Sequence, residues 1–181
     1  MKILGSLLFF DGEETDERER APVVLFGEKM HAVKITVKSQ GRDLSGVENL
    51  ELVSYGTMTE KNSKWYVRYQ ESETTGMAGT MTTIKWDLQR VIVLRNGSVE
   101  HRQEFFPGLH VDSLYRTPEL EIPMSTRTKS VDIKQLFDGS WQLLIAYELF
   151  YFQTESKQMD LRITIEEDKQ RGYKGCADSE H

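Results

Sequence analysis

Residues 91–105 have the sequence VIVLRNGSVEHRQEF. Within it, two runs rich in strand-forming residues, 91–95 and 99–105, flank the dipeptide Asn96-Gly97. Asn-Gly is the strongest short signal for a β-hairpin, because a type I′ turn needs positive φ angles at both of its central residues. The stretch therefore predicts two antiparallel strands joined by a tight type I′ turn.

The same pattern extends outward from this hairpin in both directions. From about residue 30 to about residue 166, apolar and polar residues alternate in successive runs, such as 33–38 and 65–70. Turn signals such as Lys61-Asn62-Ser63 and Asp138-Gly139 separate the runs. This alternation is typical of antiparallel strands with one buried face. Because a chain of many such strands usually hides its edges by closing, we predict an all-β fold, a single antiparallel β-barrel of about 8–10 strands.

Two segments depart from simple alternation. The run 141–152 (WQLLIAYELFYF) is apolar on both faces. Its composition allows a short helix, but its aromatic residues and the Asp-Gly turn before it favour a central strand buried on both sides. Pro118 and Pro123 cannot donate hydrogen bonds to a sheet, so we expect their strand to lie at an edge or to carry a bulge.

The length of 181 residues suits one domain. We divide the chain into an N-terminal extension and charged linker (1–28), a barrel domain (29–167) and a polar C-terminal tail (168–181). The net charge is −6, but residues 1–20 (six acids, three bases) and 166–181 (five acids, three bases) carry most of it. The nearly neutral body lacks the basic stripe typical of nucleic-acid binders, so we expect no nucleic-acid partner.

The location of the protein is also constrained by its sequence. Cys176 is the single cysteine, so the chain can form neither an internal disulfide nor a thiolate metal cluster. The N-terminal run MKILGSLLFF is a poor secretory signal and too short to span a bilayer. No other apolar run approaches membrane length. We therefore expect a cytoplasmic protein that does not contact a membrane.

The sequence offers few motifs for metal, cofactor or nucleophilic chemistry. None of the four histidines has the paired spacing of a metal site, and His110-Val111-Asp112 is more simply an exposed loop pair than a ligand pair. No Gly-x-Ser-x-Gly elbow occurs. Gly76-Met77-Ala78-Gly79 precedes a strand-like run, whereas a phosphate-binding loop precedes a helix. We expect no metal and no cofactor.

Polar residues within apolar strands are the candidate site. An arginine and a carboxylate inside a barrel can clamp a polar ligand head, because a guanidinium binds carboxylate or phosphate in a bidentate way. An Arg95–Glu71 pair could equally be a buried ion pair that fixes strand register. The aromatic residues could line a cavity or fill the barrel completely. Six residues are the candidate ligand-binding set: Tyr69, Glu71, Arg95, Tyr115, Thr117 and Tyr147.

Several short motifs, in their order and spacing, resemble the YwiB-like family of bacterial proteins. They are Trp65-Tyr66-x-x-Tyr69-x-Glu71-x-Glu73, Gly79-x-x-Thr82-Thr83, Arg95-x-Gly97, Tyr115-x-Thr117-Pro118 and Thr126. The resemblance covers about residues 29–167 and implies a calycin-like (lipocalin-like) β-barrel. It departs at Glu119-Leu120, where the family tends to have an aromatic residue and a glycine. The family has no known activity, so the resemblance carries over no catalytic residues.

Three functions remain open. The first is a barrel that binds a small, partly apolar ligand inside or at its mouth. The second is an interaction module that forms homodimers through the outer face of 141–152, because an apolar outer face needs cover. The third is an enzyme that uses Glu71, Arg95 and Tyr115, which requires these residues to converge in one cleft.

Overall fold

The computed structural model describes residues 30–151 and 155–170. A single turn of 3₁₀ helix, Glu73–Thr75, lies between the third and fourth strands. The predicted extension, 1–28, and the tail beyond residue 170 lie outside the described residues. The strands are β1 (His31–Asp43), β2 (Gly46–Lys61), β3 (Lys64–Gln70), β4 (Thr80–Trp86), β5 (Val91–Gly97), β6 (His101–Phe105), β7 (His110–Arg116), β8 (Glu121–Gln135), β9 (Trp141–Tyr151) and β10 (Glu155–Glu167).

The ten strands form one antiparallel sheet in the order β6-β5-β4-β3-β2-β1-β10-β9-β8-β7. The two end strands, β6 and β7, meet at a bridge between Glu100 and Arg116. The amide of Glu100 donates to the carbonyl of Arg116 at 3.0 Å, and the amide of Arg116 donates to the carbonyl of Glu100 at 2.9 Å. The sheet is therefore a nearly closed barrel, which confirms the prediction of an all-β, antiparallel barrel.

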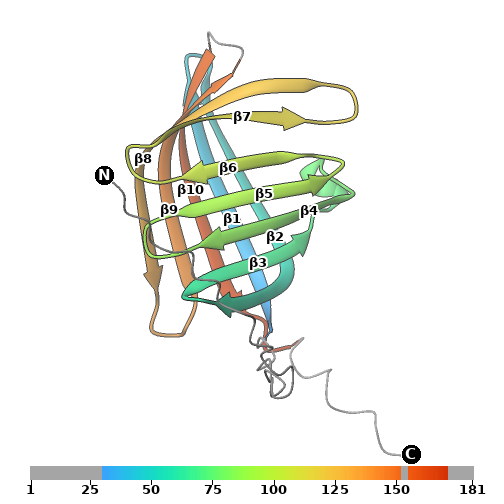
Figure 1. The fold of residues 1–181 in the computed structure, drawn as a ribbon, viewed down its shortest axis with the longest axis vertical. Helices are drawn as coiled ribbons and strands as arrows, with labels where there is room; N and C mark the ends of the chain where they lie inside the picture. Colours follow the sequence, from blue (N-terminus) through green and yellow to red (C-terminus); the bar gives the residue numbers. More distant parts are fainter. Residues whose placement is uncertain (1–29, 152–154, 171–181) are drawn as a thin grey trace, which may run out of the picture.

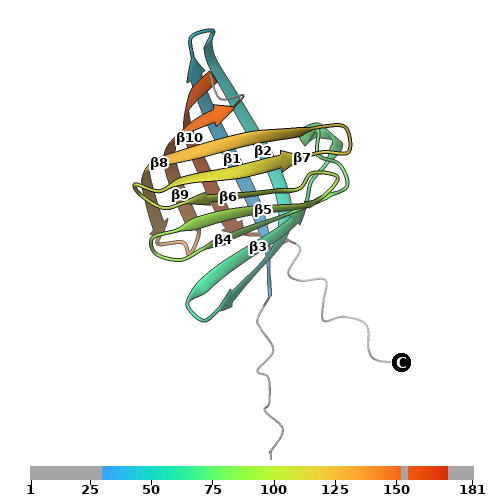
Figure 2. The same cartoon turned by 45° about the horizontal axis from the view of Figure 1, so that its top comes forward.

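The sheet folds over on itself to form two layers (Figures 1 and 2). Strands β1, β2, β8, β9 and β10 run along the long axis, and β3 to β7 cross them. Two long strands connect the layers. β2 pairs with both β1 and β3, and β8 pairs with both β7 and β9. The lumen of the barrel lies between the two layers.

The corner of β2 depends on a glycine. Gly56 pairs with Val33 of β1 and with Tyr69 of β3. A Cβ atom at this position would lie 2.2 Å from the backbone oxygen of Arg68. A side chain cannot fit there, and close backbone approach at a barrel corner is a recognised role of glycine within a strand.

The hairpin predicted at residues 91–105 forms, but its predicted type I′ turn is wrong. β5 and β6 pair antiparallel, with Arg95 opposite His101. Asn96 is not among the non-glycine residues with positive φ, which in the described chain are Asn62 and Ser63. Gly97 stays in β5, opposite Thr80, where a Cβ would lie 2.2 Å from the backbone oxygen of Gly79. Close packing against β4 and a φ angle of 131° at Gly97 both require this glycine, without a two-residue type I′ turn.

The two-residue turn with positive φ lies instead between β2 and β3. Asn62 and Ser63 have φ angles of 53° and 56°. Positive φ at both central residues is the mark of a type I′ turn, whose twist matches that of the flanking strands. The segment Lys61-Asn62-Ser63 was predicted as a turn, and this prediction is confirmed.

The apolar core fills one end of the lumen. The rings of Trp65 and Trp141 have centroids 4.4 Å apart, and Trp86 lies 6.3 Å from the first and 5.7 Å from the second. β9 lies between β10 and β8, which confirms the prediction of a central strand, but the prediction that it is buried on both sides is wrong, because barrel closure leaves its outer face toward solvent. Its inward side chains are buried, whereas the alternate residues on the outer face are half-buried.

Both prolines lie where a missing backbone donor is tolerated. Pro118 is inside the turn that Thr117 and Leu120 close, with a 2.9 Å hydrogen bond from the Thr117 amide to the Leu120 carbonyl. Pro123 lies in β8 opposite Leu114 of β7, before the pairing of β8 with β9 begins at Met124. In the described part of the chain, no helix is long and apolar enough to cross a membrane.

Candidate functional site

A row of polar side chains crosses the wall of the lumen on β3 to β6. Tyr69 pairs with Thr82, Thr82 with Arg95, and Arg95 with His101. Directly opposite residues in antiparallel strands share one face of the sheet. The four side chains therefore form one continuous row, which we call the polar row.

The rest of this wall is apolar. The next row toward the other end of the barrel is almost entirely aliphatic, and the row after that is mostly aromatic. The lumen therefore changes from aromatic to polar along the same four strands. The two rows are Val67, Ile84, Val93 and Gln103, and then Trp65, Trp86, Val91 and Phe105.

Glu71 extends the polar row beyond β3. Its amide donates to the carbonyl of Thr80 at 2.9 Å, and its carboxylate oxygen Oε1 accepts the hydroxyl of Thr82 at 2.6 Å. The residue is 5% exposed. Burial raises the pKa of the neighbouring Tyr69 hydroxyl well above its usual range, the charge of Glu71 adds to this shift, and the charge of Arg95 opposes it.

Arg95 is a half-buried residue whose side chain lines the lumen. Its Nε atom is buried and makes no hydrogen bond to any residue that the structure describes. No ion pair joins it to Glu71, although both charges act on the pKa of Tyr69. A buried charge is costly unless it is paired and hydrogen-bonded. The alternative that Arg95 and Glu71 form a buried ion pair is therefore not seen among the described residues, and Nε of Arg95 keeps its capacity to donate.

Tyr147 faces the polar row from β9, in the other layer. It is 6% exposed, and burial raises the pKa of its hydroxyl to about 12, against the opposing charge of Arg95 and a hydrogen bond with Gln103. The amide Nε2 of Gln103 donates to the hydroxyl of Thr126 at 3.2 Å. Tyr147 and Gln103 are neutral at physiological pH and can serve as hydrogen-bonding groups.

These groups surround a cavity of about 170 Å³. Its polar end is formed by Tyr69, Glu71, Arg95, Gln103 and Tyr147, so the structure brings together four of the six predicted site residues. The remaining lining is mostly aliphatic. It includes Val37, Leu50, Leu52, Ile84, Val93, Met159, Leu161 and Ile163.

Tyr115 reaches the polar row only through His101. The two rings form an edge-to-face contact with centroids 5.5 Å apart, and Nε2 of His101 lies 3.1 Å from the hydroxyl of Ser113. Burial, helped by the charge of Arg95, lowers the pKa of His101 to about 4. His101 is therefore neutral at physiological pH. Tyr115 itself does not line the cavity that Glu71 and Arg95 share.

Thr117 lies apart from the other predicted residues. It begins the turn between β7 and β8, and its hydroxyl accepts hydrogen bonds from the amides of Glu119 (3.3 Å) and Leu120 (3.2 Å). These bonds hold the turn, as threonine hydroxyls commonly do. The structure thus gives Thr117 a local role in the chain reversal.

The sequence interpretation missed several polar residues of the lumen. Thr82 and His101 occupy the centre and the end of the polar row, and Thr128 is 2% exposed with its hydroxyl unpartnered among the described residues. One signal was available for His101. His101 follows the Asn96-Gly97 turn signal closely. It lies opposite Arg95 if five residues separate the two, as they do in the structure.

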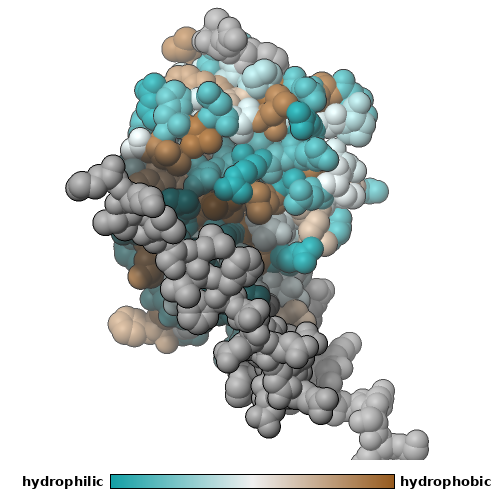
Figure 3. Space-filling model, in the orientation of Figure 1, coloured by the Kyte–Doolittle hydropathy of each residue, from teal (hydrophilic) through white to brown (hydrophobic). Residues whose placement is uncertain are grey.

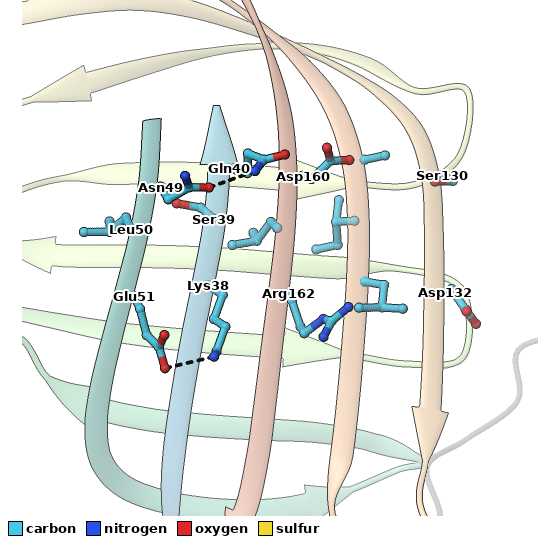
Figure 4. Close-up of a pocket in the computed structure, with 14 residues that line it drawn as sticks. Lys38, Ser39, Gln40, Asn49, Leu50, Glu51, Ser130, Asp132, Asp160 and Arg162 are labelled. Atoms are coloured by element: carbon cyan, nitrogen blue, oxygen red, sulfur yellow. Dashed lines mark hydrogen bonds and ion pairs between the residues drawn. The ribbon is translucent and has the colours of Figure 1, made fainter. Parts of the chain in front are cut away.

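A larger hollow of about 730 Å³ lies outside the barrel, on the outer face of β1, β2, β8, β9 and β10 (Figure 4). Its polar groups pair with one another: Nζ of Lys38 lies 3.0 Å from Glu51, and Gln40 donates to Asn49 at 2.8 Å. On the opposite side of the molecule, hydrophilic and hydrophobic residues are interspersed (Figure 3). Neither face offers the unpartnered buried charge found in the lumen.

Among the described residues, no group of three or more His, Cys, Asp or Glu side chains is placed so that it could hold a metal ion. The prediction that His110 and Asp112 form an exposed loop pair is wrong, because both lie in β7, paired with β8. Nε2 of His110 contacts the hydroxyl of Ser125. Its ring packs near Phe150, with centroids 6.0 Å apart.

The fold and the lumen define a ten-stranded β-barrel protein with a small, partly polar internal cavity. Residues 33–163 match the family described as "Domain of unknown function (DUF1934)", and the chain belongs to that family. It is 27% identical over 134 residues to the "Uncharacterized beta-barrel protein YwiB" of Bacillus subtilis (strain 168), covering 74% of this chain and 92% of that protein. These matches confirm the family resemblance inferred from the motifs.

A solved structure supports the fold. The crystal structure of the ywiB protein from Bacillus subtilis superposes with a TM-score of 0.67 at 25% sequence identity. The match covers 76% of this chain and 92% of that one. The shared β-barrel is thus seen in an experimental structure of a relative.

Proposed function

We propose that this protein is a non-catalytic binding protein that holds one small, partly apolar ligand at the polar end of its lumen. The observation that carries the proposal is the buried Nε of Arg95, which has no partner among the described residues, beside a cavity of about 170 Å³. A cation in such a place raises the free energy of the empty protein. A ligand that accepts its hydrogen bonds removes that cost.

The composition of the lining also supports binding. A ligand site is mostly apolar, with a few convergent polar groups that fix orientation. The cavity has this composition, with Glu71, Arg95 and Tyr147 at one end and aliphatic residues around the rest. The calycin-like architecture implied by the family resemblance is consistent with an internal ligand.

The size of the cavity limits the ligand. A cavity of roughly 150 Å³ accommodates one benzene-sized molecule, and this cavity has about 170 Å³. That is smaller than the roughly 300–1,000 Å³ of sites for drug-sized molecules. A long-chain fatty acid does not fit inside, so the ligand is a small metabolite with a short apolar part.

Native mass spectrometry of protein purified without added ligand, followed by thermal unfolding against a panel of small metabolites, tests this function. We expect at least one small polar compound to raise the unfolding temperature of the wild type and not that of Arg95→Gln. Arg162→Gln is the matched control, because Arg162 lines the outer hollow and not the lumen. If no compound in the panel stabilises the wild type, the proposal fails.

A second candidate function, self-association into a homodimer, is favoured by the hairpin of β1 and β2. Leu44 and Val47 in this hairpin are 109% and 57% exposed, and the hairpin projects beyond the barrel (Figure 2). Gathered exposed apolar residues often mark an interface with another protein. Sedimentation velocity that shows a dimer in the wild type and a monomer in Val47→Glu supports this candidate. A strict monomer at every concentration removes it.

A further inference from the structure

The polar end of the lumen contains two opposite charges that do not pair with each other. The carboxylate of Glu71 is almost fully buried, accepts the hydroxyl of Thr82 on Oε1 and also interacts with the hydroxyl of Tyr69. The guanidinium of Arg95 has a buried Nε without a partner among the described residues. Opposite charges inside one barrel attract strongly, so a site that keeps them unpaired leaves room for something between them.

The two charges lie on the same part of the wall. Glu71 is held beside Thr80 of β4 by a backbone hydrogen bond, and Arg95 pairs with Thr82 of the same strand. They therefore flank β4 at neighbouring positions. Both also act on one group: Glu71 raises and Arg95 lowers the pKa of the Tyr69 hydroxyl. One small molecule at the Tyr69 hydroxyl can reach both charges.

Charge balance decides which kind of molecule fits. His101, the other ionisable group of the polar row besides Tyr69, is neutral at physiological pH. Among the described residues that line the cavity, Glu71 and Arg95 are the charged ones, so the lining carries one negative charge and one positive charge. A ligand with a single charge pairs with one of them and leaves the other buried and unpaired, at a high cost. A ligand with both charges pairs with both.

We propose that the ligand is a small zwitterion of the α-amino acid class, with its carboxylate on Arg95, its ammonium group on Glu71 and a short apolar side chain in the aliphatic part of the cavity. This inference rests on the proposed function and narrows it. The guanidinium donates to a carboxylate in a bidentate way, and an ammonium group has three donors for the free capacity of the Glu71 carboxylate. Ile84 and Val93 line the cavity close to the polar row and suit an aliphatic side chain.

Three probes that share the same four-carbon isobutyl unit test the proposal. L-valine has both charges, isovalerate has the carboxylate without the ammonium group, and isobutylamine has the ammonium group alone. Isothermal titration calorimetry of the full chain is expected to show L-valine binding at least about tenfold more tightly than either probe, because each of them leaves one charge of the site unpaired.

Two variants are expected to change which of the three probes binds most tightly, if Glu71 binds the ammonium group and Arg95 binds the carboxylate. Glu71→Gln keeps the shape of the side chain and its contact with Thr82 but removes the negative charge. It is expected to bind isovalerate about as well as the wild type binds L-valine, and Arg95→Gln is expected to favour isobutylamine. Glu51→Gln and Arg162→Gln, on the outer face, serve as controls that keep the wild-type order.

The outcomes separate this inference from the broader function. If isovalerate or isobutylamine binds as tightly as L-valine, or if Glu71→Gln leaves the order of the probes unchanged, the zwitterion assignment is overturned while ligand binding in the lumen stands. If none of the three probes binds but a neutral or singly charged metabolite from the panel stabilises the protein through Arg95, the assignment is also overturned. If no compound binds at all, both proposals fail.

Discussion

The two ends of the lumen are built on the same four strands and differ in what they do for the molecule. At the aromatic end, Trp86 and Phe105 are fully buried, and three tryptophan rings contact one another. At the polar end, Arg95 and His101 carry buried nitrogen atoms without partners among the described residues. Burial of apolar surface stabilises a fold, whereas unpaired buried polar atoms destabilise it. Nε1 of Trp86 at the aromatic end is also buried without a partner among the described residues, but only the polar end combines such an atom with a charge and a cavity. We therefore infer that the aromatic end maintains the barrel, and we propose that the polar end is the ligand site.

The largest effect is expected at the aromatic end. Trp86→Ala removes a ring that is 0% exposed and leaves a cavity against Trp65 and Trp141. The free energy of unfolding is expected to fall by about 3–5 kcal/mol, the usual cost of removing a buried large aromatic side chain. Chemical denaturation measures this change. Phe137→Ala is the control, since Phe137 is fully exposed, and a loss at Phe137 equal to that at Trp86 contradicts the comparison.

The corner between the layers comes next. Gly56→Ala places a Cβ 2.2 Å from the backbone oxygen of Arg68, and we expect a loss of about 3 kcal/mol, because backbone has to move. Gly41→Ala is the matched control in β1, where the new Cβ meets the flexible side chains of Lys157 and Met159. Denaturation of the two variants side by side checks this. Equal losses show that the corner does not depend on Gly56.

At the polar end, the hydroxyl of Thr82 is the group whose loss is most harmful. Thr82→Val keeps the shape of the side chain but removes the donor to the Glu71 carboxylate. The expected loss of stability is about 1–3 kcal/mol, because a buried acceptor is left without its partner. Thr82→Ser keeps the hydroxyl and is expected to lose less. Denaturation curves in which valine and serine variants coincide indicate that the hydrogen bond contributes nothing.

His101 makes the polar end sensitive to acid. Its pKa is about 4 in the folded protein and about 6.5 when the chain is unfolded, so the unfolded state binds more protons between these values. Stability is therefore expected to fall as the pH drops from about 6.5 to about 4, by roughly 2–3 kcal/mol for this residue. Unfolding free energies measured across this range for the wild type and His101→Gln give the difference. If the free energy of unfolding of His101→Gln depends on pH as strongly as that of the wild type, other groups cause the effect.

The smallest expected change has the opposite sign. Arg95→Met replaces an unpartnered cation by an apolar side chain of similar length. The ligand-free variant is expected to be as stable as the wild type or more stable by up to about 1 kcal/mol, because buried charges are often replaced without loss. Thermal and chemical unfolding measure this. A large loss of stability means that Arg95 makes a structural contact and weakens its assignment to a ligand.

The fold was largely predictable from the sequence, because alternation is a local property. Runs such as 33–38 and the turn at Asn62-Ser63 determine strands without knowledge of their partners. The turn at Asn96-Gly97 was predicted wrongly for the same reason. Its glycine is required by the close approach of Gly79 from a neighbouring strand, which no window of sequence around it contains.

The candidate site was predictable only in part. Polar residues within apolar strands drew attention to Tyr69, Glu71, Arg95 and Tyr147, which line one cavity. Thr117 was chosen from the same kind of signal, but its hydroxyl is used by the turn amides. The size of the cavity depends on how side chains from both layers pack, and register across ten strands decides which side chains meet. Neither the cavity size nor the strand register can be inferred from a short stretch of sequence.

The most direct test of the central claim, that the polar end of the lumen is the ligand site, is a proton–nitrogen NMR titration of the arginine Nε–H groups. The Arg95 signal is assigned by its loss in Arg95→Gln. We expect it to move on addition of L-valine, or of any compound that raises the unfolding temperature, while the signal of Arg162 stays in place. A compound that stabilises the protein and leaves the Arg95 signal unmoved contradicts the account.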